Sequence, residues 1–225
     1  MSGPPWLVAA LTAGFVVIAL YCAACLLTQG FADRRAAAAE ANHVVMATAM
    51  AAMALPAGMA WVPPGVGAAA FGLAAVAWLV LGLRSRRATS PAAGGAVCPS
   101  PPAHLALLDA AMAGMYGVML LRAPAPAPAG GAGMGDMSGM AHMGGHAHIM
   151  APAPSPTLLL AGGVLVLVLL VHAGRRVVVA ATVGGAALAG AGPLQRVTGS
   201  ARARESCQAV MSAGMAVMLV VMLAG

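Results

Sequence analysis

The sequence predicts an all-α polytopic membrane protein, with six transmembrane helices arranged as three helical hairpins. Of its 225 residues, 61% are hydrophobic and only 7% are charged, whereas about 25% of the residues of a soluble domain are charged. The apolar residues form six stretches, each long enough to cross about 30 Å of hydrocarbon. The positively charged residues are all Arg, and they lie mostly in the connections between these stretches.

The six predicted spans form a single integral membrane domain over residues 1–225. The first does not resemble a cleavable signal, because no positive residue precedes it and its first charges, Asp33 and Arg34, follow the apolar run. The spans are predicted, in order, at residues 6–28, 43–62, 66–83, 104–121, 157–173 and 207–224.

The distribution of Arg residues predicts the orientation of the spans. On the other side of the bilayer, the alternate connections contain only Arg122. Because cytoplasmic loops carry the excess of positive residues, both termini are expected outside the cell membrane. Ten of the eleven Arg follow the first, third or fifth span, at positions 34, 35, 84, 86, 87, 175, 176, 196, 202 and 204.

Two long connections are predicted to lack membrane-spanning structure. Residues 174–206 form a basic cytoplasmic linker, because Val177–Leu194 consists largely of Ala and Gly and ends in Gly-Pro. This linker offers a contact for a cytoplasmic partner. Residues 122–156 form an outer loop rich in Met, His and Pro, whose Ala-Pro runs favour extended arms. The loop is too rich in Gly and polar residues to pack a core of its own, so disorder is expected.

The second, fourth and sixth spans each carry a ladder of methionines at helical spacing. Steps of three and four residues place every sulfur on one narrow stripe of a helix. Met-bearing helices alternate with helices that lack Met, so one parallel Met-bearing helix is predicted in each hairpin, with Met50, Met112 and Met215 at one depth. The ladder residues are Met46, Met50, Met53, Met112, Met115, Met119, Met211, Met215, Met218 and Met222.

The ladders have two interpretations. A stripe of thioethers suits a soft monovalent metal such as Cu(I), and it equally suits a flexible packing face. The outer loop adds a second group of soft ligands that could capture copper, although low-complexity drift is the alternative. Its candidate ligands are Met134, Met137, Met140, His142, Met143, His146, His148 and Met150.

Further polar residues lie near the cytoplasmic ends of the ladder helices. His43 opens the second span and His104 the fourth, and Cys207 takes the equivalent place in the sixth. These three residues could receive an ion that leaves the ladder, or the histidines could be interfacial caps. Asp109 is costly within a span and could guide a cation or proton, pair with an Arg or join a hydrogen-bond network. The Cys22-x-x-Cys25 motif is weak, and no disulfide is expected.

Three segments resemble known membrane proteins: HVVMATAMAAM at 43–53, DAAMAGMYGVML at 109–120 and ESCQAVMSAGMAVMLVVML at 205–223. They are similar to an uncharacterised actinobacterial membrane family, domain of unknown function 5134. This resemblance implies a multi-span bacterial membrane protein without an established activity. The M-x-x-x-M spacing also resembles, more loosely, the Ctr-type copper importers, in which three such helices line a pore. Those importers have three spans and a following G-x-x-x-G helix, unlike this chain.

The sequence therefore supports one main function and two alternatives. In the first, the outer loop captures Cu(I) and the ladder conducts it. In the others, the protein is a non-transporting membrane scaffold or a metal-responsive sensor, and the Met stripes pack helices. No nucleotide-binding loop or catalytic motif occurs, so no enzyme is expected. The Arg clusters lie beside apolar segments and are explained by topology, so no nucleic-acid partner is expected. The sequence does not specify an oligomeric state.

Overall fold

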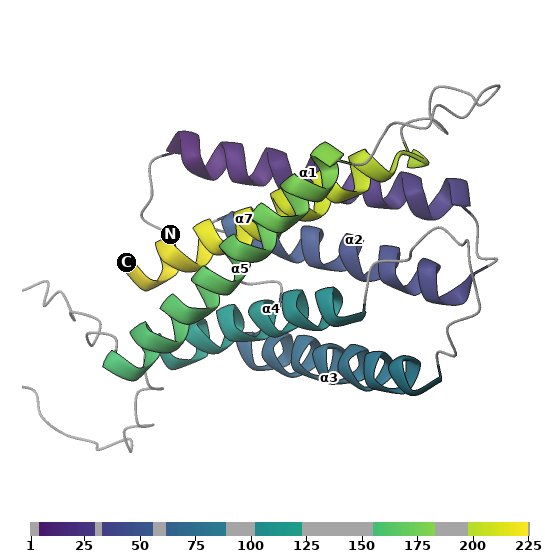
Figure 1. Ribbon diagram of the computed structural model, residues 1–225. Helices are drawn as coiled ribbons and strands as arrows, with labels where there is room; N and C mark the ends of the chain where they lie inside the picture. The colour runs from purple at the N-terminus through teal and green to yellow at the C-terminus, as the bar shows by residue number, and fades with distance from the viewer. Residues whose placement is uncertain are drawn as a thin grey trace, which may run out of the picture.

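A computed structural model of the protein describes residues 5–29, 33–55, 62–88, 102–122, 155–182 and 198–224. Five of the helices in these ranges, all except α2, are long and apolar enough to cross a membrane. The prediction of an all-α polytopic membrane protein is therefore confirmed. The helices are α1 (Pro5–Gln29), α2 (Arg34–Ala54), α3 (Pro64–Ala88), α4 (Pro102–Arg122), α5 (Pro156–Thr182) and α7 (Ala201–Ala224) (Figure 1).

The helices pack mainly in consecutive pairs. α1 contacts α2, α3 contacts α4 and α5 contacts α7, and smaller contacts of α4 with α7 and of α2 with α4 join the pairs. Figure 1 shows α2, α4 and α7 running from right to left, while α1, α3 and α5 run the opposite way. The starts of the three Met-bearing helices thus share one end of the bundle with the Arg clusters, and we call it the Arg-rich end.

Glycine allows close approach at two of the helix contacts. A Cβ atom at Gly67 would lie 2.6 Å from the ring of Tyr116, and one at Gly214 would lie 2.7 Å from the ring of Phe15. Each aromatic ring therefore occupies the space that a side chain would take. Small residues at interfaces are how membrane helices gain packing contacts, because lipid supplies no hydrophobic force between them.

The helix that contains most of the predicted second span extends beyond that span at its start and is described only as far as Ala54. α2 begins nine residues earlier, because the Asp33 carboxylate accepts a hydrogen bond from the backbone N–H of Arg35 at 2.9 Å and caps the helix. It ends at Ala54, and Leu55 is extended with φ −84° and ψ 137°, as expected before a proline, Pro56. The shifted helix includes Arg34, Arg35 and Glu40, which lower its apolar character.

The two edges of the predicted cytoplasmic linker at 174–206 are helical. α5 continues to Thr182 and α7 already begins at Ala201. Two contacts hold the extension of α5 against α7. The Arg176 guanidinium pairs with Glu205 at 2.9 Å, and Arg202 Nε donates to the Ala180 carbonyl at 3.0 Å. The second bond satisfies a backbone acceptor in the last turn of α5, where no intrahelical partner exists.

The methionine ladders lie inside the bundle. Eight of the ten ladder sulfurs belong to side chains that are at most 3% exposed, and Met119 and Met222 are half-buried against the same core. The partner helices present aliphatic side chains outward, such as Leu20, Leu73 and Leu160 at 65%, 72% and 71% exposed. Thioethers therefore fill the interior while branched hydrocarbon side chains face the surroundings, as a lipid environment requires.

Candidate metal centre

Buried polar side chains gather at the Arg-rich end, next to the methionine core. His43, His104 and Asp109 are only 3%, 2% and 0% exposed. Burying such groups costs about 1–3 kcal/mol each unless a hydrogen bond or ligand compensates. The partners of each group therefore indicate what the site can do.

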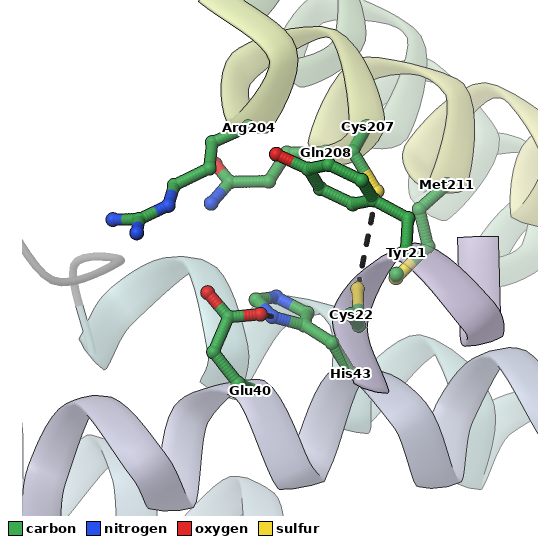
Figure 2. Close-up of a pocket in the computed structure, with 8 residues that line it drawn as sticks. All are labelled: Tyr21, Cys22, Glu40, His43, Arg204, Cys207, Gln208 and Met211. Atoms are coloured by element: carbon green, nitrogen blue, oxygen red, sulfur yellow. Dashed lines mark hydrogen bonds and ion pairs between the residues drawn. The ribbon is translucent and has the colours of Figure 1, made fainter. Parts of the chain in front are cut away.

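A small cavity lies among α1, α2 and α7 at this end (Figure 2). Its volume is about 10 Å³, which is about the space that one water molecule or a single ion needs. We call it the inner cavity. It is lined by Tyr21 and Cys22 of α1, Glu40 and His43 of α2, and Arg204, Cys207, Gln208 and Met211 of α7.

The inner cavity brings together donor atoms with the spacing of a metal site. The Cys22 sulfur, a Glu40 carboxylate oxygen and a His43 ring nitrogen lie within 4.8 Å of one another. Figure 2 shows the sulfurs of Cys22 and Cys207 pointing toward each other, 4.0 Å apart. Two thiolates that bind one ion at about 2.3 Å can be up to about 4.6 Å apart. The observed separation therefore allows both sulfurs to reach one ion.

The tautomers of the histidines can be assigned from their contacts. His172 Nε2 lies 2.7 Å from His104 Nδ1 and 3.4 Å from Arg176 Nε. Because a guanidinium nitrogen can only donate, His172 Nε2 is the acceptor, and His104 Nδ1–H donates to it. His104 Nε2 then carries a lone pair, and in the described part of the chain this buried atom has no hydrogen-bond partner.

His43 repeats this pattern on α2. Its Nδ1 lies 3.7 Å from a Glu40 carboxylate oxygen, while its buried Nε2 has no hydrogen-bond partner among the described residues. The rings of His43 and His104 are 5.7 Å apart. Metal-binding histidines commonly contact a neighbour through one ring nitrogen and bind the ion through the other.

Asp109 is a structural neighbour of this group rather than an ion-pair partner. Asn42 Nδ2 donates to its Oδ2 at 3.0 Å, and among the described residues no Arg pairs with it. Its other oxygen, Oδ1, is buried and has no hydrogen-bond partner among the described residues. The hydrogen bond from Asn42 joins α2 to α4 close to the histidines, because Asn42 directly precedes His43.

The structure gathers only some of the predicted site residues in one place. His43, Cys207 and Met211 line the inner cavity, and His104 lies beside His43. The other nine ladder methionines lie in or against the core beyond. The predicted ligands of the outer loop, from Met134 to Met150, lie outside the described residues.

Cys22 and Glu40, which belong to the group of donor atoms in the cavity, were not predicted as ligands. Cys22 belongs to a C-x-x-C motif, but its neighbour Cys25 turns away and contacts the Thr198 carbonyl oxygen at 3.8 Å. Glu40 falls in a segment that the sequence assigns to a connection between spans. A helix that begins after Asp33 places Glu40 and His43, three residues apart, on the same face. This spacing could have indicated Glu40 as a neighbour of His43.

The fold and these buried groups define an α-helical, multi-pass membrane protein with a polar centre at one end of its core. A sequence model described as Domain of unknown function (DUF5134) matches residues 35–222, and the chain belongs to this family. The match takes in α3, α4, α5 and nearly all of α2 and α7, whereas Tyr21 and Cys22 of α1 precede it. No curated protein and no solved structure matches the chain.

Proposed function

We propose that this protein binds Cu(I) at the inner cavity and passes it along the methionine core. The observation that carries the proposal is the approach of Cys22 and Cys207 to 4.0 Å, beside an imidazole and the thioether of Met211. Thiolates and thioethers are soft ligands, and together they select Cu(I) over hard ions. His43 would complete the set.

The residues in and beside the inner cavity favour Cu(I) over Zn(II). Two thiols, His43 and Glu40 alone would also suit Zn(II), which accepts sulfur, nitrogen and carboxylate ligands. Met211 favours copper, because it lines the cavity and also belongs to the core that holds Met46, Met112 and Met215. Thioethers are poor ligands for zinc and good ones for Cu(I). The outer loop, with five Met and three His, would capture the ion at the other end.

A scaffold or sensor is the second candidate, and one observation favours it. The ladder sulfurs are packed against Leu105, Leu108 and Leu219, which are equally buried. Met fills irregular gaps in such cores without any ligand role. In this case, the protein would hold other membrane components, or respond to metal in the outer loop without conducting it.

The direct test is a Cu(I) competition titration of the purified full-length protein under reducing, anaerobic conditions. A chelator of known affinity reports bound copper, and X-ray absorption reports whether sulfur and nitrogen surround it. A variant that lacks residues 130–150, and therefore the outer ligands, should retain one Cu(I). The same deletion combined with Cys22→Ser and Cys207→Ser should not.

Cys25→Ser is the matched control, because Cys25 lies one turn from Cys22 but contacts Thr198 instead of Cys207. This variant should bind copper like wild type. Retention of copper by the Cys22/Cys207 variant would refute the proposed site. A preference of the wild type for Zn(II) over Cu(I) would refute the metal assignment, and binding of neither would favour the scaffold.

A further inference from the structure

A second cavity opens between α4 and α5 at the Arg-rich end. Its volume is about 530 Å³, within the range of about 300–1,000 Å³ typical of small-molecule sites. Ala103, Leu107 and Val179 form its apolar wall. The polar lining consists of His104, His172, Arg175 and Arg176. We call this cavity the basic pocket, because it has two guanidinium groups and no acidic residue in its lining.

The positive charge of the basic pocket is only partly neutralised. Arg176 Nη1 donates to both carboxylate oxygens of Glu205, at 2.9 and 3.2 Å. Arg175 is exposed, and it has no hydrogen-bond or ion-pair partner within the described ranges. One full positive charge therefore faces the pocket without a counter-ion from the described protein.

His172 adds an N–H donor to the lining of the pocket. Its Nε2 accepts from the neighbouring His104 and Arg176, as argued above, so the neutral ring carries its proton on Nδ1. The two rings stack with centroids 4.7 Å apart, which holds His172 in place. The pocket thus combines an imidazole N–H with guanidinium donors, a set that matches the oxygens of a phosphate group.

We propose that the basic pocket binds a phosphate group through His172, Arg175 and Arg176. The group could belong to an anionic phospholipid or to free phosphate, and both offer the same oxygens. The surface beside the pocket favours a lipid, because Val177 and Val178 follow the arginines on α5 and are 57% and 62% exposed. Basic pockets between transmembrane helices bind lipid headgroups in this way. None of His172, Arg175 and Arg176 lines the inner cavity, so the proposal does not rest on copper binding.

The test compares the protein in nanodiscs of phosphatidylcholine with nanodiscs that also contain phosphatidylglycerol. Native mass spectrometry counts retained lipid, and thermal unfolding reports stabilisation. Wild type should retain phosphatidylglycerol and unfold at a higher temperature in its presence. Arg175→Gln should weaken retention about fivefold, the effect of about one basic residue at an anionic surface. Arg175 makes no hydrogen bond or ion pair with the described residues, so this variant should fold.

Arg84→Gln is the matched control, because Arg84 is an exposed arginine at the same end of the bundle, on α3, and does not line the pocket. It should behave like wild type. Inorganic phosphate added to phosphatidylcholine nanodiscs distinguishes the sources: equal stabilisation would identify a free anion as the ligand. Equal retention of phosphatidylglycerol by wild type and Arg175→Gln, with no response to phosphate, would overturn the proposal.

Discussion

The Arg122 guanidinium donates a hydrogen bond to the backbone carbonyl oxygen of Leu223 at 3.2 Å, and a second one to that of Met222. The end of α4 thereby caps the end of α7, whose last carbonyls have no partner within the helix. Among the arginines that the structure describes, Arg122 is the one outside the clusters of the Arg-rich end. Its exceptional position is explained by this structural role.

Replacing Arg122 should therefore destabilise the protein without affecting metal binding. Hydrogen bonds from a charged donor contribute about 1.5–3 kcal/mol, so Arg122→Gln should lower the unfolding temperature measurably in detergent. Arg84→Gln, which removes an equal charge from an exposed position, is the control and should change it little. Equal unfolding temperatures for the two variants would show that the cap contributes nothing.

The methionine ladder can be tested by exchange of sulfur for carbon. Met50→Leu, Met112→Leu and Met215→Leu together keep nearly the same volume, at less than about 1.5 kcal/mol per site in a packed core. If the core passes Cu(I), copper uptake into proteoliposomes should fall sharply while expression and unfolding temperature stay near wild type. Leu has no lone pair to offer the ion.

The reverse exchange supplies the control for the ladder. Leu105→Met, Leu108→Met and Leu219→Met disturb equally buried positions and remove no thioether, so uptake should be unchanged. A triple Met→Leu variant that transports copper like wild type would establish the ladder as packing alone.

The contact of Gly214 with Phe15 predicts a strong effect of one methyl group. Gly214→Ala places a Cβ 2.7 Å from the Phe15 ring, and overpacking of this kind costs about 1–3 kcal/mol. Gly117→Ala meets nothing within 4 Å and should instead be neutral or stabilising, because Ala favours a helix. Adding Phe15→Leu should rescue Gly214→Ala. Failure of this rescue in thermal unfolding would mean that the strain arises elsewhere.

The orientation predicted from the Arg distribution can be tested with reporter fusions. Fusions after residues 90, 140, 190 and 225 should report inside, outside, inside and outside, because Arg-rich connections stay in the cytoplasm. An outside signal at residue 190 would place one Arg cluster outside and contradict the parallel direction of the Met helices.

The outer loop should bind Cu(I) as an isolated peptide. Residues 130–152 contain five Met and three His, and thioethers predict Cu(I) over Zn(II). A peptide with each Met replaced by Leu is the control and should lose Cu(I) but keep any binding by His. Failure of the wild-type peptide to compete with a micromolar chelator would eliminate the capture role.

Local periodicity was sufficient to predict the core. Residues three or four positions apart share one face of a helix, as do Met46 and Met50 or Met211 and Met215. All four side chains are 0% exposed. Apolar length likewise predicted the crossing helices. The start of α2 was missed because Asp33 was read as a loop charge, although Asp is among the preferred N-cap residues.

The candidate site was less predictable because it depends on contacts between distant parts of the chain. Cys22 and Cys207 are 185 residues apart, and His104 and His172 are 68 apart. No spacing rule within one helix relates such pairs. Only the packing of α1 and α5 against the Met-bearing helices brings them together, so helix periodicity could predict His43 and Cys207 separately but not their shared cavity.

The burial of the ladder also determines its resistance to oxidation. Conversion of Met to its sulfoxide follows the exposure of the sulfur, and it turns an apolar side chain into a polar one. In the folded bundle, Met50, Met112 and Met215 are shielded on every side, whereas Met119 and Met222 at the far end are only half-buried. Peroxide should therefore modify that end first and leave the interior thioethers reduced for as long as the helices stay packed.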